Sequence, residues 1–106
     1  MSQPNLAVSI ERMRSAAADA SALLRALAHE DRLLLLCQLS QGERSVGELE
    51  ALLDIHQPTL SQQLGVLRNE GLVATRREGK RIHYSVAEPK ALALLATLYQ
   101  LYCPQP

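Results

Sequence analysis

Apolar side chains recur along the first quarter of the chain at alternating steps of four and three residues. The series is Leu6, Ile10, Met13, Ala17, Ala20, Leu24 and Leu27. This spacing places the side chains along one narrow stripe of a helix. We therefore expect one helix, or two nearly continuous helices, over residues 6–28.

The middle of the chain has the pattern of three further helices. The segment from Glu30 to Ser40 is apolar on nearly every side after an acidic first turn, which is typical of a central buried helix. Ser45 and Glu48 then have the spacing of a capping box and begin a short helix. A linker of three or so residues leads to a helix that begins near Gln57, with a proline in its first turn. Residues 45–70 therefore predict a helix-turn-helix.

Two alternating segments follow the predicted helix-turn-helix. Residues 72–75 and 82–86 alternate as strands do, and Glu78-Gly79-Lys80 between them supplies a turn. A hairpin in this place is a wing, at residues 72–86.

A last helix is expected over residues 89–103, and it has no charged side chain from Ala91 to Cys103. So long an uncharged surface would be exposed on a monomer, so we expect it to pair with the N-terminal stripe in a homodimer.

Composition fits one domain. The chain has 106 residues, of which 47% are hydrophobic and 21% charged, as in a single globular domain over residues 1–106. No apolar run approaches the roughly 18 residues of a membrane span, and the first residues lack a signal-peptide core. We expect a cytoplasmic protein with reduced thiols and no membrane partner. The expected fold class is mainly α with a β-hairpin wing, a homodimeric winged helix-turn-helix.

The balance of 11 basic and 11 acidic side chains gives no net charge, which at first argues against a nucleic-acid partner. The charge is segregated, however. Between residues 57 and 85 there are five basic side chains and two acidic ones, and the rest of the chain carries six and nine. Phosphate responds to the local field, and uncharged polar side chains on a helix can read base edges. The sequence therefore predicts a double-stranded DNA surface made of Gln57, Thr59, Ser61, Gln62, Gln63, Arg68, Arg76, Arg77, Lys80 and Arg81.

Other classes of function have less support in the sequence. A thiol enzyme would need a base beside a cysteine, and no catalytic triad or phosphate loop is present. The few aromatic residues disfavour single-stranded nucleic acid. A protein-interaction module stays open because of the uncharged last helix. His29, His56 and His83 are scattered and assemble no metal site by spacing, so no metal and no cofactor is expected.

Two long segments resemble the arsenic-repressor (ArsR/SmtB) family of winged-helix repressors. They are LLRALAHEDRLLLLCQL and SVGELEALLDIHQPTLSQQLGVLRNEGLVATRREGKRIHYSV. The resemblance implies a dimer that binds an inverted-repeat operator and releases it with an inducer, with a recognition helix near residues 57–69 and a wing near 76–81. Family members often have His where Gln63 stands, which leaves the operator sequence open. Metal-sensing members often carry paired cysteines where this chain has Ser45 and Gly47.

Taken one at a time, Cys37 is typical of a small core residue and Cys103 of a thiol near the end of the chain. As a pair, in LLLLCQL and LATLYQLYC, they are similar to the sulfide-responsive branch of the family. The resemblance implies that reactive sulfur species or an oxidant link them through a disulfide or polysulfide, within or between subunits. The alternative is a metal- or metalloid-responsive repressor that uses the same cysteines as ligands.

Overall fold

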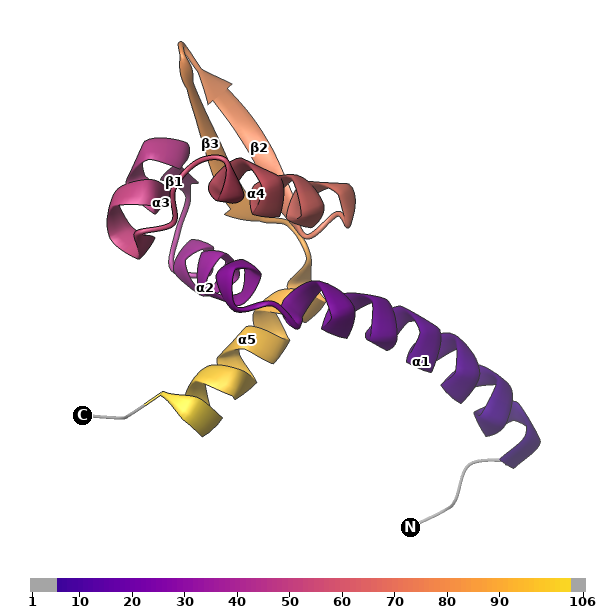
Figure 1. Ribbon diagram of the computed structural model, residues 1–106. Helices are drawn as coiled ribbons and strands as arrows, with labels where there is room; N and C mark the ends of the chain where they lie inside the picture. Colours follow the sequence, from indigo (N-terminus) through magenta and orange to yellow (C-terminus); the bar gives the residue numbers. More distant parts are fainter. Residues whose placement is uncertain (1–5, 104–106) are drawn as a thin grey trace.

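The computed structural model describes residues 6–103 and has the expected fold class, with helices around a small antiparallel sheet (Figure 1). The elements in chain order are α1 (Leu6–Leu27), α2 (Glu30–Leu39), β1 (Arg44–Ser45), α3 (Val46–Leu53), α4 (Thr59–Asn69), β2 (Val73–Glu78), β3 (Arg81–Val86) and α5 (Pro89–Tyr102). The β2–β3 hairpin rises at one end beside α3 and α4, and α1 and α5 diverge at the other end (Figure 1).

Helix α1 is one continuous helix that projects away from the rest of the chain (Figure 1). Its last turn packs into the core through Ala26 and Leu27, which are each 5% exposed. Farther from the core its apolar stripe is open, and Met13 and Leu24 are 64% and 54% exposed. A stripe of this kind stabilises the protein only when another apolar surface covers it.

The core forms where α2 meets α3, α4 and the sheet. Its largest fully buried side chains are all leucines: Leu35, Leu36, Leu49, Leu60, Leu64 and Leu67. The leucines of α4 recur at steps of four and three residues, so this helix buries one face and leaves the opposite face in solvent. The core therefore fixes which polar side chains of α4 point outward.

The predicted helix-turn-helix is present, with one boundary corrected. Helix α3 has the expected capping box, in which Ser45 Oγ accepts from the backbone N–H of Glu48 and the Glu48 carboxylate accepts from that of Ser45. It ends at Asp54 in the left-handed conformation, with φ 56°. Helix α4 begins at Thr59, not near Gln57, and Pro58 is its N-cap. The side chain of Gln57 takes over the capping, since its Oε1 accepts from the backbone N–H of Ser61 at 3.1 Å.

The sheet has the order β1-β3-β2, and both pairs are antiparallel. The wing strands are longer than expected. They pair from Val73 with Val86 to Glu78 with Arg81, and only Gly79, with φ 62°, and Lys80 remain in the turn. Strand β1 was not predicted, because two residues are too few for an alternation to be visible.

Helix α5 starts at Pro89 as expected and ends at Tyr102, with Cys103 as its C-cap. Ala91 and Leu95 are buried, whereas Leu101 and Tyr102 are 70% and 80% exposed. Between residues 6 and 103 no helix combines the length and apolar character that a membrane crossing requires.

Candidate nucleic-acid interface and thiol pair

The outward face of α4 carries most of the uncharged polar residues that the sequence singled out. Ser61 and Gln62 are exposed, and Thr59 is half-buried at the start of the helix; the charged Arg68, near the end of the helix, is exposed as well. Gln57 lies just before the helix and is exposed, with its Oε1 engaged as the cap of α4. The face therefore presents hydroxyl and amide groups that can bond to base edges in a major groove.

Gln63 differs from this set. It is half-buried, and its Oε1 accepts a 3.0 Å hydrogen bond from Nη1 of Arg32 on α2. No sequence pattern predicts this contact, because its two partners lie 31 positions apart. Arg32 belongs to the ALAHEDRLLLL segment, but nothing in the spacing points from it to α4.

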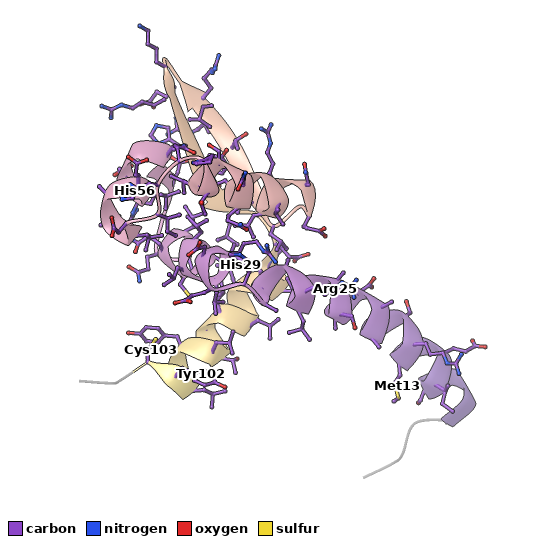
Figure 2. The ribbon with its side chains drawn as sticks, in the orientation of Figure 1. Met13, Arg25, His29, His56, Tyr102 and Cys103 are labelled. Carbon is purple, nitrogen blue, oxygen red and sulfur yellow. The ribbon has the colours of Figure 1, made fainter. Side chains whose placement is uncertain are left out.

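The wing presents basic side chains to solvent, and Figure 2 shows nitrogen-ended side chains extending from its tip. Arg77, Lys80 and Arg81 are exposed. They lie at and beside the hairpin turn, as expected from the sequence. An exposed basic tip of this kind can contact a phosphate backbone.

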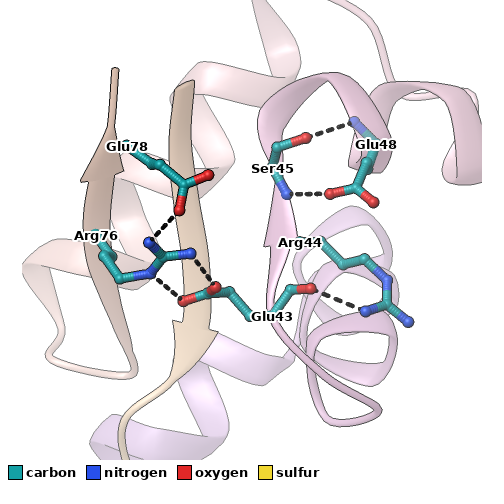
Figure 3. A network of polar contacts seen from close by, with 6 residues as sticks. All are labelled: Glu43, Arg44, Ser45, Glu48, Arg76 and Glu78. Carbon is teal, nitrogen blue, oxygen red and sulfur yellow. Dashed lines mark hydrogen bonds and ion pairs between the residues drawn. The ribbon is translucent and has the colours of Figure 1, made fainter. Parts of the chain in front are cut away.

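Arg76 is also exposed, but its charge is compensated (Figure 3). Its Nη2 and Nε contact the two carboxylate oxygens of Glu43 at 2.7 and 3.2 Å, and its Nη1 contacts Glu78 at 2.9 Å. The hydrogen bonds from Arg76 lower the pKa of both carboxyl groups, and the same bonds raise the pKa of Arg76. Sequence reasoning missed Glu43, which precedes β1 and lies 33 positions from Arg76.

The two cysteines lie on α2 and at the end of α5, far apart in the sequence, and both are present as thiols. Cys37 is half-buried on α2 and packs against the core, whereas Cys103 is exposed at the end of α5 (Figure 2). Burial raises the pKa of Cys37, and the negative charge of the Cys103 thiolate raises it further. The second effect requires that the two thiols lie within range of one another's charge.

The three histidines occupy separate places. Nδ1 of His29 accepts from the backbone N–H of Asp31 and caps α2, and Nε2 of His56 contacts Asp54 at 2.6 Å. His83 lies in β3, with its ring Nε2 buried. Within residues 6–103 no three His, Cys, Asp or Glu side chains are grouped so that they could hold a metal ion.

A groove of about 620 Å³ runs between α1 and the start of α5. Its lining is mainly apolar, with Ala16, Ala20 and Leu24 from α1 and Leu94 from α5. It also includes charged residues: Asp19, Glu70, Glu88 and Lys90. Small residues let a second helix approach closely. The groove joins the two surfaces that we expected to form a dimer interface.

Comparison with known proteins agrees with this geometry. The family model described as "Bacterial regulatory protein, arsR family" matches residues 29–75. A biofilm growth-associated repressor from Agrobacterium fabrum is 56% identical over 96 residues, which cover 91% of this chain and 82% of that protein. The resemblance drawn from the sequence is therefore confirmed at the level of the family.

Two solved structures extend the agreement to the fold. The transcriptional repressor BigR from Xylella fastidiosa has a TM-score of 0.84 and 52% identity, covering 90% of this chain and 97% of that one. A homodimeric winged helix-turn-helix DNA-binding domain from Mycobacterium bovis has a TM-score of 0.73 and 32% identity, covering 85% and 83%. With its helix-turn-helix, wing and sequence identity, this chain belongs to the arsR family of bacterial regulatory proteins, which are DNA-binding transcriptional regulators and not enzymes.

Proposed function

We propose that this protein is a homodimeric repressor that binds an inverted-repeat operator in double-stranded DNA, in the cytoplasm, and releases it when Cys37 and Cys103 become linked. The observation that carries the DNA-binding half is the exposed polar face of α4 beside a basic wing. In this proposal Ser61 and Gln62 contact base edges, and Arg77, Lys80 and Arg81 contact phosphates.

The dimer forms through α1 and α5. The groove shares Ala20 and Leu24 with the open stripe of α1 and Leu94 with the uncharged segment of α5, so a second copy would cover all three surfaces. The relative from Mycobacterium bovis is described as homodimeric, which supports this arrangement. Two α4 helices related by the dimer axis would enter successive major grooves about 34 Å apart.

The proposed thiol switch is supported by the charge interaction between Cys37 and Cys103 and by the similarity to biofilm growth-associated repressors. The first step is attack by the exposed Cys103 thiolate on the outer sulfur of a persulfide or polysulfide. This gives a Cys103 persulfide and releases a thiolate from a persulfide, or a shortened sulfide chain from a polysulfide. Attack by Cys37 on the inner sulfur then forms the disulfide and expels hydrosulfide. The two thiols lose two electrons and the sulfane sulfur gains them.

The link acts as a switch only if linked protein binds the operator more weakly than reduced protein, and each tenfold loss corresponds to about 1.4 kcal/mol. Cys37 is on α2, which packs against α4, so a displacement of α2 reaches the recognition helix through the core. Misplaced helices would lose both base and phosphate contacts.

The test measures binding of the reduced protein to its own upstream DNA, before and after treatment with a persulfide donor, peroxide, arsenite, zinc or a chelator. We expect the persulfide donor to weaken binding and intact mass to show the loss of two hydrogens or the gain of sulfur. Cys37→Ser and Cys103→Ser should each keep DNA binding and abolish the response. Release by arsenite or zinc, but not by the donor, would favour a metal- or metalloid-responsive repressor instead.

A further inference from the structure

The side chain of Arg32 joins three helices. From its place on α2, its Nε donates to the carbonyl oxygen of Ala26 at 2.6 Å and its Nη2 donates to that of Arg25 at 3.1 Å. Both carbonyls belong to the last turn of α1. Its Nη1 donates to Gln63 on α4 at 3.0 Å. One guanidinium group therefore contacts the end of the dimerisation helix and the recognition helix at once.

The chemistry of these contacts favours arginine over any other residue. The last carbonyls of a helix have no partner within the helix, and Ala26 and Arg25 are in that position in α1. The Arg25 carbonyl also accepts a hydrogen bond from the N–H of Ala28, just after the helix, at 3.3 Å. A planar guanidinium offers donors in a fixed fork and accepts nothing, so the oxygen of the Gln63 amide must face it. A lysine has a single nitrogen and cannot hold the same three acceptors in this geometry.

The neighbouring glutamines on α4 lie in different surroundings. At about 100° per residue, Gln62 lies about 160° from both Leu60 and Leu64, on the side away from the core. Gln63 lies only about 60° from Leu60 and about 40° from Leu67, on the flank that faces α2. This agrees with their burial, since Gln62 is exposed and Gln63 is half-buried and bonded to Arg32.

We propose that Gln63 does not read a base, and that Arg32 is a positioning residue which uses Gln63 to set the pose of the recognition helix relative to α1 and α2. The proposal rests on the DNA-binding function proposed above and makes the regulation of that surface more specific. Cys37 lies on the same helix as Arg32, so any movement of α2 that follows linkage to Cys103 would be transmitted to α4 through this contact.

The decisive variants are Gln63→Glu, Gln63→Ala and the matched control Gln62→Glu. The probe is a duplex selected from a random DNA pool by the reduced wild-type protein. Gln63→Glu keeps an acceptor for Arg32, so we expect the same selected sequence and affinity within about threefold of wild type. Gln62→Glu adds the same charge on the outward face and should change the selected base, because a carboxylate prefers the amino group of cytosine. Gln63→Ala should weaken binding about threefold to tenfold on every sequence.

Arg32→Lys completes a double-mutant cycle. If the two residues act through one contact, Gln63→Ala causes little further loss of affinity in the Arg32→Lys background. In Gln63→Ala the ratio of affinities before and after persulfide treatment should also be smaller than in wild type. Circular dichroism shows whether each variant is folded. If Arg32→Lys does not fold, the Arg32 guanidinium NMR signals of wild type and Gln63→Ala report the same contact.

Three results would overturn the proposal: a changed base preference in Gln63→Glu, independent losses in the cycle, or unchanged affinity in Gln63→Ala with unchanged Arg32 signals. Failure of the proposed function is visible separately. Reduced wild-type protein that selects no DNA refutes the repressor assignment, and wild-type protein that ignores the persulfide donor refutes only the thiol switch. The cycle on reduced protein is independent of the thiol result.

Discussion

Replacing Arg77 by alanine should lower the salt dependence of operator binding without changing the base preference. Arg77 is exposed on β2, and within residues 6–103 it takes part in no ion pair, unlike its neighbour Arg76. Its charge is therefore available to a phosphate. Each phosphate contact contributes about 0.9 to the slope of log affinity against log salt, and a homodimer loses two contacts, so the slope should fall by about 1.8.

The magnitude is large enough to measure. Between 50 and 200 mM salt, a difference of about 1.8 in slope means that wild-type affinity falls about twelvefold more than that of Arg77→Ala. Fluorescence polarisation with a labelled operator at several salt concentrations gives both slopes. Arg12→Ala is the matched control, because it removes the same charge from α1, which lies far from the wing (Figure 1).

The control slope should equal that of wild type. Equal reductions in Arg77→Ala and Arg12→Ala would mean that only total charge matters, and would refute the assignment of the wing to phosphate contact. An unchanged slope in Arg77→Ala would refute it as well. A loss confined to one base position would instead make Arg77 a base-reading residue.

Three further predictions concern reactivity, acid stability and the core. In single-cysteine variants, iodoacetamide should modify Cys37 more slowly than Cys103 at neutral pH, because burial raises the pKa of Cys37. Mass spectrometry gives both rates. A faster reaction at Cys37 would contradict the order of attack proposed above. The hydrogen bonds from Arg76 lower the pKa of Glu43 below its usual 4.5. Ionised Glu43 therefore stabilises the fold above that pH, and this stabilisation is lost as the pH falls below it. The melting temperatures of wild type and Glu43→Gln should converge in acid. The side chain of Leu64 is 1% exposed, so Leu64→Ala should lower the free energy of unfolding by about 3 kcal/mol. Urea unfolding at fixed protein concentration measures this loss. A loss under about 1 kcal/mol would show that the site collapses around the cavity.

The parts of the fold that follow from local rules could be predicted from the sequence. The capping box at Ser45, the leucine spacing of α4 and the turn at Gly79 each depend on residues that are close in the chain, and each is present. The start of α4 could not be placed, because Pro58 is equally compatible with a first turn and with an N-cap. A two-residue strand such as β1 depends wholly on its partner β3.

The polar contacts between distant segments were beyond the reach of sequence patterns. Counting charges made Arg76 equivalent to Arg77, yet Glu43 approaches only one of them from the loop before β1. Residue type made Gln63 equivalent to Gln62, yet Arg32 holds only one of them. Glu78, two positions from Arg76, pairs with it as well. In both pairs, however, one partner lies more than 30 positions away, and its approach is fixed by packing and not by periodicity.

Helix α2 connects the two halves of the proposed mechanism. Arg32 and Cys37 are five positions apart, so at about 100° per residue they face directions about 140° apart. One face of α2 therefore contacts the end of α1 and α4 through Arg32, while the other carries the thiol that lies within range of Cys103 on α5. A short helix with fully buried leucines between these faces moves as a unit, since a close-packed core resists local deformation. A change in the distance between α2 and α5 would then shift the recognition helix without any contact between the cysteines and DNA.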